Sequence, residues 1–247
     1  MKIVVIGGSG LIGSYLVSKL GEHGHEAVPA SPDTGVNTLT GEGLAEVLTG
    51  ASVLIDVSNS PSFEAKAVMD FFETSTRNLL AAEAEAGVGH HVALSVVGTG
   101  RLPDSGYLEA KAAQEALIAK SSVPYSIVEA TQFYEFVGRI ADSATEDGVI
   151  LVPDALIQPM AAEDVAAAVG RTAVGSPLNG KTEIGGPEEF RFGDLIQQHL
   201  SLSNDPRKVV VDPHGTYFGT ELEERSLVPG EGATLSETTY AEWLKSH

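Results

Sequence analysis

Residues 2–13 read KIVVIGGSGLIG, a short run of β-branched residues that passes directly into a glycine-rich turn. The run Ile3 to Ile6 is too short and too β-branched for a helix, so it predicts a buried strand. From Leu11 to about Leu20 apolar residues recur at helical spacing, and a second strand is expected over 25–30. The start of the chain therefore predicts a strand, a glycine turn, a helix and a second strand.

The glycines of this turn have the spacing that a pyrophosphate requires. Gly7 permits the tight turn, Gly10 lets the backbone approach the phosphates, and Gly13 lets the helix pack closely on the strand. The helix N-terminus then offers unpaired N–H groups to the anion. The alternative is an ordinary strand–helix turn. It does not account for the order and spacing of strand, turn, helix and second strand, which are those of a dinucleotide-binding unit. The turn predicts a dinucleotide-binding unit whose cofactor contacts are Gly7, Ser9, Gly10, Leu11, Ile12 and Gly13.

Strands and helices continue to alternate along the chain. Further strands are expected at 52–57, 91–96, 124–129, 149–152 and 181–185, and helices at 42–49, 63–86, 106–120, 132–146, 162–174 and 191–201. The last forty residues have a mixed pattern, with short strands and a terminal turn around Trp243. Such alternation predicts an α/β fold with a doubly wound parallel sheet, a Rossmann fold. We expect a single NAD(P)-binding domain over 1–247, with residues from about 150 to 247 contributing a small C-terminal substrate lobe.

Composition narrows the class of function. The chain has 34 acidic and 15 basic residues, a formal charge of −19, so it lacks the cations that neutralise nucleic-acid phosphates. It has no cysteine, no apolar stretch approaching the roughly 20 residues of a membrane span, and no histidine pair at metal-ligand spacing. We therefore expect a cytoplasmic protein with a small-molecule substrate, without a metal site and without nucleic-acid or membrane partners.

The residue after the second strand bears on the choice of nucleotide. An acidic residue about 20 positions beyond the glycines grips the ribose 2′-hydroxyl of NAD and repels the 2′-phosphate of NADP. Here the position holds Ser31, followed by Pro32 and Asp33. The missing carboxylate favours NADP over NAD; an Asp33 that turned inward would reverse this preference.

A serine, a tyrosine and a lysine form a candidate catalytic set. Tyr107 and Lys111 are four residues apart on an expected helix and hence on one face, and Ser95 ends the fourth strand. A lysine charge near the phenol would lower the pKa of the tyrosine from about 10, and the serine would hold a carbonyl oxygen. Tyr107 would then act as general acid in reduction and as general base in oxidation. The alternative is a helix surface on which tyrosine and lysine merely coincide.

Several stretches together resemble the short-chain dehydrogenase/reductase superfamily, in its atypical NmrA-like branch. They are GGSGLIG at 7–13, TSTRNLLAAEAEAGV at 74–88, HHVALSVVGTG at 90–100, YLEAK at 107–111, VPYSIVEATQFYEF at 123–136 and PMAAEDVAAAV at 159–169. The resemblance covers most of the first 170 residues. It implies NAD(P) as cofactor and a homodimer as the assembly.

The resemblance also implies roles for residues. Ser95, Tyr107 and Lys111 correspond to the catalytic serine, tyrosine and lysine, and Lys111 would also bind the nicotinamide ribose. Ser58 and Asn59 would lie along the cofactor, and the loop from Thr131 to Phe133 beside the nicotinamide. Glu129 departs from the pattern, since relatives often carry arginine there. The branch also includes proteins that bind the dinucleotide as a redox signal and catalyse no reaction.

Apolar residues near the end of the fifth strand are candidates for a substrate pocket, although aromatic residues at this spacing also form cores. They are Val97, Phe133, Tyr134, Phe136 and Met160. The sequence thus predicts an NAD(P)-dependent oxidoreductase that transfers hydride to or from a small or medium carbonyl, alcohol, quinone or enone. The alternative function is a non-catalytic redox sensor that regulates a protein partner.

Overall fold

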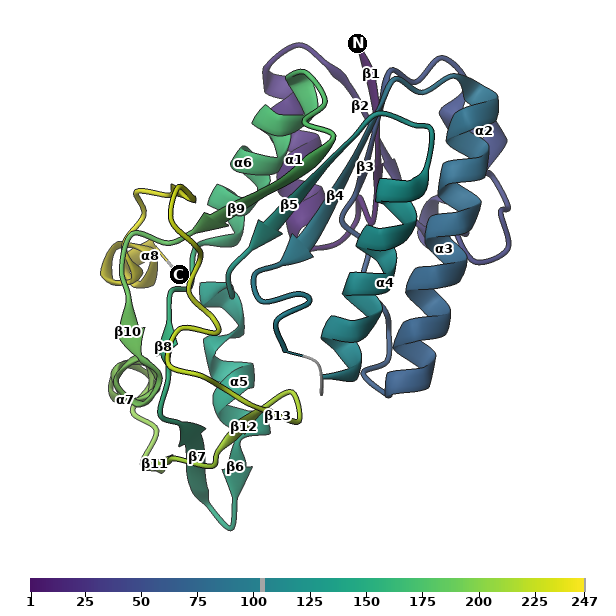
Figure 1. Cartoon of the computed structure of the whole chain (residues 1–247). Coiled ribbons are helices and arrows are strands. Elements are labelled where there is room, and N and C mark those ends of the chain that lie inside the picture. Colours follow the sequence, from purple (N-terminus) through teal and green to yellow (C-terminus); the bar gives the residue numbers. More distant parts are fainter. Residues whose placement is uncertain (103–104, 247) are drawn as a thin grey trace.

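Seven parallel strands form the central sheet of the protein, whose computed structural model describes residues 1–102 and 105–246. The strand order is β14-β9-β5-β4-β3-β1-β2, which confirms the predicted doubly wound parallel sheet (Figure 1). The order reverses at β1, the kind of point at which such sheets bind ligands. The strands span Lys2–Ile6 (β1), Glu26–Ala30 (β2), Val53–Asp56 (β3), His90–Val96 (β4), Tyr125–Ala130 (β5), Gly180–Gly185 (β9) and Thr234–Leu235 (β14).

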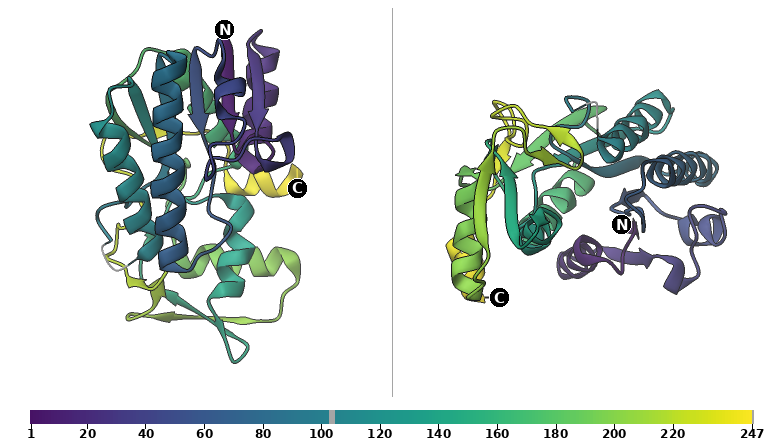
Figure 2. Two further views of the ribbon diagram at one scale, coloured as in Figure 1. Left: turned by 90° about the vertical axis from the view of Figure 1, so that its right-hand side faces the viewer. Right: turned by 90° about the horizontal axis from the view of Figure 1, so that it is seen from below.

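Helices cover both faces of this sheet (Figure 2). Because side chains alternate between the faces of a strand, Ile3 and Val5 pack with α1 and α6, whereas Val4 and Ile6 pack with α2 and α3. The helices span Leu11–Glu22 (α1), Leu44–Leu48 (α2), Ala65–Ala86 (α3), Gly106–Lys120 (α4) and Ala162–Val174 (α6). Within the described residues, every helix is too short or too polar to cross a bilayer.

A second hydrophobic core lies in a smaller lobe below the carboxyl edge of the sheet (Figure 1). Its helices are α5 (Val137–Ser143), α7 (Phe192–Ser203) and α8 (Tyr240–Ser246). Its strands are β6 (Thr145–Glu146), β7 (Val149–Pro153), β8 (Leu156–Ile157), β10 (Phe190–Arg191), β11 (Lys208–Asp212), β12 (Thr216–Tyr217) and β13 (Thr220–Glu221). The lobe is not one continuous segment, because α6, β9 and β14 return to the main domain.

Two local predictions were wrong. The helix expected over 132–146 is a 3-10 turn (η2, Tyr134–Phe136) followed by the shorter α5, because the backbone of Gln132 and Tyr134 pairs with Met160. The turn expected around Trp243 is the helix α8. The Thr239 hydroxyl accepts from the Glu242 N–H at 3.3 Å and so supports the start of that helix.

A buried ion pair joins α3 to the start of β4. Glu83 and His91 have fully buried side chains, and Nδ1 of His91 lies 2.8 Å from Oε1 of Glu83. Burial lowers the pKa of His91, but the nearby carboxylate of Glu83 outweighs it, and the pKa is raised overall. This stabilisation is therefore complete below the ordinary histidine pKa of about 6.5 and is lost as the pH rises through the raised value.

Replacing Glu83 with glutamine is expected to lower the free energy of unfolding by about 3 kcal/mol at pH 6, since it leaves a buried charge without its partner. At pH 9 the loss should be smaller, because His91 gives up its charge as the pH rises through its raised pKa. Urea unfolding at both pH values measures the difference, with Glu85→Gln, an exposed position on the same helix, as control. Equal losses at the two pH values would show that the pair is not ionic.

Candidate functional site

The glycine turn joins β1 to α1 at the point where the strand order reverses. Gly7 adopts a φ of +76°, and its carbonyl accepts from the Gly10 N–H at 2.9 Å. A Cβ on Gly13 would collide with the Gly7 carbonyl oxygen and would lie 2.7 Å from Cα of Gly8. Gly10 caps α1 without a side-chain hydrogen bond, so the first helical N–H groups are open to an anion.

The end of β2 carries a second feature that fits a dinucleotide. The Ser31 hydroxyl is buried and has no hydrogen-bond partner among the described residues. An unsatisfied buried hydroxyl costs free energy, which a ligand hydroxyl or phosphate would recover. Asp33 lies exposed in the 3-10 turn η1 (Pro32–Thr34), so its carboxylate is not packed against Ser31. The open N–H groups of α1 and the unpartnered hydroxyl together suit a bound dinucleotide.

The segment after β3 connects the glycine turn to the candidate tyrosine. Oδ1 of Asp56 accepts from the N–H of Ser58 at 3.0 Å and from its hydroxyl at 2.6 Å. Asn59 follows, and its Oδ1 accepts from the Tyr107 hydroxyl at 3.2 Å. A Cβ on Gly7 would lie 3.0 Å from Cα of Ser58. The phenol and the predicted cofactor turn therefore meet through residues 58–59 at one edge of the sheet.

Tyr107 lies within a cluster of aromatic rings. Its ring centroid is 6.0 Å from that of Phe63, 6.1 Å from that of Phe72 and 5.9 Å from that of Phe218. This burial raises the pKa of Tyr107 to about 12. The direction is opposite to the lowering expected for a phenol beside a lysine, because desolvation of the phenolate dominates here.

Lys111 is buried one helical turn further along α4. Its Nζ donates to the Leu94 carbonyl at 2.9 Å and to Oε1 of Gln114, and it lies 4.4 Å from the centre of the Phe72 ring. Gln114 in turn donates to Oδ2 of Asp56 at 3.0 Å. Burial lowers the pKa of Lys111 to about 8, although the carboxylates of Asp56 and Glu115 favour its charged form. Lys111 thus belongs to a buried polar network that reaches the end of β3.

The Ser95 side chain lies under α4, where its hydroxyl donates to Oε1 of Glu115 at 2.5 Å. Lys181 of β9 binds the other oxygen of Glu115 at 2.5 Å and Oε1 of Glu129 at 2.9 Å. Burial raises the pKa of Glu129, against the hydrogen bond from Lys181. Lys181 therefore supplies a cation beside Glu129, the position where relatives often carry arginine. The structure brings Tyr107 to Asn59, whereas it engages Ser95 with Glu115.

The predicted substrate residues fall into two groups. Val97, Tyr134 and Met160 are buried, and the Tyr134 hydroxyl donates to the Thr238 carbonyl at 3.1 Å within the core of the lobe. Phe133 and Phe136 are half-buried and stack with their centroids 5.5 Å apart. These last two have the partial exposure that contact with a ligand requires.

Three buried polar side chains lie at this edge, and two of them, Thr99 and Gln132, were not among the predicted contacts. Oγ1 of Thr99, Oγ1 of Thr131 and Oε1 of Gln132 are buried without a hydrogen-bond partner among the described residues. They follow β4 and β5, at the same edge of the sheet as Ser31. Only Thr131 was predicted as a contact. Gln132 could have been predicted as a contact because it lies in the same loop as Thr131. Gln114 could have been predicted as a partner of Lys111 because it follows three residues later on the same helix.

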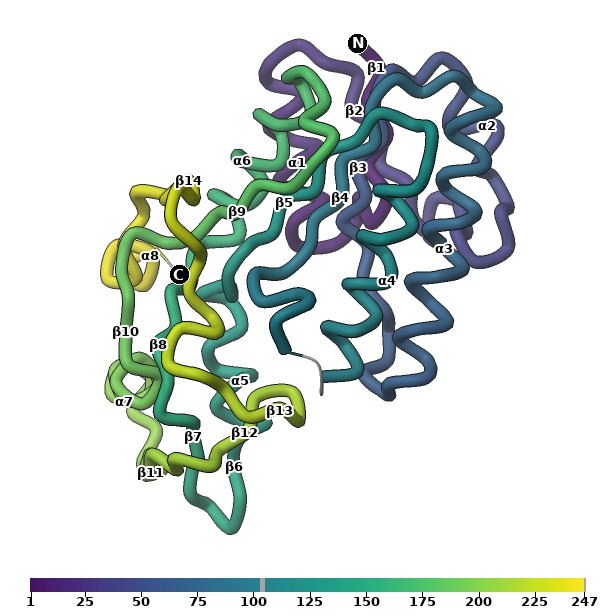
Figure 3. The backbone as a smooth tube through the Cα atoms, viewed as in Figure 1, coloured from purple at the N-terminus to yellow at the C-terminus, as the bar shows by residue number. Residues whose placement is uncertain are grey.

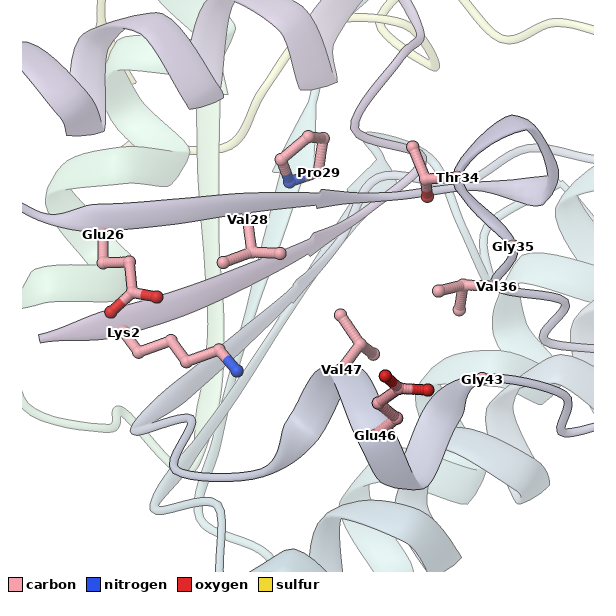
Figure 4. Close-up of a pocket in the computed structure, with 10 residues that line it drawn as sticks. All are labelled: Lys2, Glu26, Val28, Pro29, Thr34, Gly35, Val36, Gly43, Glu46 and Val47. Atoms are coloured by element: carbon pink, nitrogen blue, oxygen red, sulfur yellow. The ribbon is translucent and has the colours of Figure 1, made fainter.

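A cavity of about 400 Å³ lies elsewhere, between β2 and α2 (Figure 4). Its lining combines Val28 and Val47 with the charged side chains of Lys2, Glu26 and Glu46. It contains none of the predicted site residues, so it is separate from the glycine turn and from Tyr107.

Similar solved structures carry the same fold. A short-chain dehydrogenase/reductase superfamily protein from Agrobacterium tumefaciens with bound NAD has 17% identity and a TM-score of 0.74, covering 100% of this chain and 95% of the other. A dTDP-glucose 4,6-dehydratase from Streptomyces venezuelae with NAD has 16% identity and a TM-score of 0.75, with the same coverages. A dTDP-4-dehydrorhamnose reductase from Bacillus anthracis in complex with NADP has 15% identity and a TM-score of 0.68, covering 98% and 92%.

The chain therefore has the fold of solved short-chain dehydrogenase/reductase structures, as the resemblance in its sequence predicted. No family model matches the sequence, and no curated protein matches it. At these identities the comparisons establish the architecture alone, because one fold can host many different activities.

Proposed function

We propose that this protein is an NAD(P)-dependent oxidoreductase of the atypical, NmrA-like short-chain type, with Tyr107 as acid and base. Its reaction would be hydride transfer to or from a small or medium carbonyl or alcohol. The observation that carries the proposal is the hydrogen bond from Tyr107 to Asn59, beside the residue that touches the glycine turn. A proton donor next to a dinucleotide turn is the arrangement that carbonyl reduction needs.

A bound reduced nicotinamide would supply the hydride. With a pKa of about 12, Tyr107 keeps its proton at neutral pH and can donate it to the alkoxide oxygen that forms when a carbonyl accepts hydride. Lys111 would bind the ribose, its ammonium being fixed by Leu94 and Gln114. Ser95 would orient the carbonyl oxygen only after exchanging its hydrogen bond to Glu115.

The proposed cofactor contacts are those predicted from the sequence. They comprise Gly7, Ser9, Gly10, Leu11, Ile12 and Gly13 of the turn, Ser31 at the ribose, and Ser58, Asn59, Lys111, Thr131 and Phe133 along the nicotinamide half. The proposal is tested by titrating the purified protein with NADPH and NADH, followed by addition of ketones, aldehydes and quinones. Nucleotide binding with substrate-dependent oxidation supports it, and failure to bind either nucleotide overturns it.

We propose NADP as the preferred nucleotide, because Ser31 offers a hydroxyl and no carboxylate at the end of β2. Replacing Ser31 with aspartate is expected to weaken NADPH binding at least about tenfold, about 1.4 kcal/mol, through repulsion of the 2′-phosphate. NADH binding should be retained or improved. Fluorescence titration of both nucleotides gives the ratio, with Ser31→Asn as a neutral control of similar size. If both nucleotides lose affinity equally, Ser31 does not face the ribose.

The redox sensor is the second candidate function. Two observations favour it: Ser95 is engaged by Glu115, and the pKa of Tyr107 is raised to about 12 rather than lowered. A sensor needs the nucleotide site but not a proton donor. It would bind NADPH or NADH without turnover of any carbonyl in the panel, and Tyr107 would then be replaceable without loss of function.

A further inference from the structure

Two exposed phenylalanines stand beside the candidate proton donor. Phe63, just before α3, is 64% exposed, and Phe218, at the tip of the β12–β13 hairpin, is 48% exposed. Their ring centroids lie 6.0 Å apart, and each is within about 6 Å of the Tyr107 ring. Exposure of phenylalanine rings to water is unfavourable. The joint position of these two rings against Tyr107 therefore marks an apolar surface that a ligand can cover.

The hairpin reaches this position from the lobe, as the backbone trace shows (Figure 3). Phe218 has a φ of +50° and Gly219 a φ of +82°, between the paired residues Tyr217 and Thr220. Two-residue hairpin turns of this type favour asparagine followed by glycine, and a bulky residue with positive φ is an outlier. Such strain concentrates at functional sites. The chain therefore holds an aromatic ring over Tyr107 at a conformational cost.

Space for the rest of a ligand lies behind the hairpin. A hollow of about 260 Å³ lies between β12, α5 and β7, and Phe218 is among the residues that line it. The ring of Phe218 also stacks on that of Tyr107, so this side chain connects the hollow to the candidate proton donor. The lining of the hollow combines apolar side chains, such as Ile140, Leu151 and Phe192, with Ser143 and Thr216. An apolar substituent on a ligand ring would fit this hollow better than a charged group.

The charges around the lobe disfavour a phosphorylated ligand. A diphosphate is bound by arginines or lysines that are free to pair with it at the site itself. Four arginines of the lobe and of the loop after β4 are engaged by carboxylates: Arg101 with Glu183, Arg191 with Glu224, Arg207 with Asp205 and Arg225 with Glu189. Arg139 of α5 instead lies 5.6 Å from the centre of the Phe136 ring.

We propose that Phe63 and Phe218 form a stacking subsite that presents a planar, uncharged, unsaturated ring to Tyr107. This inference rests on the proposed function and names its substrate class: an aryl ketone, quinone or ring-conjugated enone. The subsite suits such a ring better than a sugar nucleotide, because it offers two aromatic faces beside a partly apolar hollow, and the four arginines named above are engaged by carboxylates.

The test measures binding without turnover, by calorimetry in the presence of NADP and without reduced nucleotide. The probes are tetralone, its saturated counterpart trans-decalone, and UDP-glucose. We expect tetralone to bind about three- to tenfold more tightly than trans-decalone, because aromatic rings attract one another beyond the effect of their buried area. Equal binding of the two ketones, or tighter binding of UDP-glucose, overturns the proposal.

Variants connect the preference to the two rings. Phe63→Leu should weaken tetralone binding by about three- to tenfold and leave trans-decalone nearly unchanged, because leucine keeps an apolar contact and removes the aromatic face. Phe218→Asn should weaken binding of both ketones, and that of tetralone more, because it removes apolar area as well as an aromatic face. Phe218→Asn should also raise the Tm, because asparagine suits the turn, so its loss of affinity cannot come from misfolding. Leu202→Ala, at an exposed apolar position of α7, is the control and should leave both affinities unchanged.

The outcome of the test of the stacking subsite can be distinguished from the outcome of the test of the proposed function. Ring discrimination without ketone turnover overturns the oxidoreductase proposal and leaves the subsite standing. Turnover that is equally fast for tetralone and trans-decalone, with equal affinities, overturns the subsite and leaves the oxidoreductase.

Discussion

Replacing Tyr107 with phenylalanine is expected to lower kcat/KM for ketone reduction about 100- to 10,000-fold, the range that general acid catalysis contributes. The substitution removes one oxygen and keeps the ring, so the contacts with Phe63, Phe72 and Phe218 remain. The lost hydrogen bond to Asn59 should have little effect on the fold, because water can reach this hydrogen bond and take the place of the lost hydroxyl. Affinity for NADPH should stay within about twofold, since no phosphate contact is removed.

Stopped-flow or steady-state oxidation of NADPH with a reactive ketone measures the loss, and fluorescence titration measures the affinity. Tyr125→Phe is the matched control, because Tyr125 begins β5 at the opposite edge of the sheet and should retain full activity. A Tyr107→Phe enzyme with more than about a tenth of the wild-type kcat/KM would exclude Tyr107 as the essential acid. Asn59→Ala should reduce activity less, since it removes only the partner of the phenol.

The parts of the fold that the sequence predicted well are those with local causes. The strand, glycine turn and helix at the start of the chain follow from β-branching and helical spacing, and each appears within two residues of its expected bounds. The segment from 132 to 146 was misjudged because its apolar spacing suits a helix. Pairing of the backbone with Met160, which is remote in sequence, keeps Gln132 and Phe133 out of it.

The candidate site likewise combines features with local causes, which the sequence predicted, and features set by contacts between distant segments, which it did not. Spacing of four residues places Tyr107 and Lys111 on one helical face, but it gives no measure of burial. Burial lowers the pKa of Lys111 and raises that of Tyr107, so the expected mutual tuning is outweighed by desolvation. The partner of Ser95, Glu115, is twenty residues away, and Phe218 comes from a region whose sequence pattern was mixed. Contacts between distant segments decide these features, and a single sequence contains little signal for them.

Replacing Gly13 with alanine is expected to weaken binding of both nucleotides at least about 100-fold, the order of effect that a displacement of about 1 Å has on positioned groups. The added methyl would collide with the Gly7 carbonyl oxygen and lie 2.7 Å from Cα of Gly8, and both obstacles are backbone. Helix α1 must therefore move away from the turn, which takes its open N–H groups away from the phosphates. Overpacking of this kind should also lower the free energy of unfolding by about 1–3 kcal/mol.

Gly21→Ala, on the same helix, distinguishes this effect from a general response to alanine. A Cβ at Gly21 meets no atom within 4 Å, so the substitution should raise the free energy of unfolding by about 0.5–1 kcal/mol and leave nucleotide affinity unchanged. Nucleotide titration and urea unfolding of both variants complete the comparison. A Gly13→Ala protein that unfolds earlier but binds NADPH normally would place the pyrophosphate elsewhere. Loss of binding with an intact fold would tie the close approach of α1 and the turn to the cofactor.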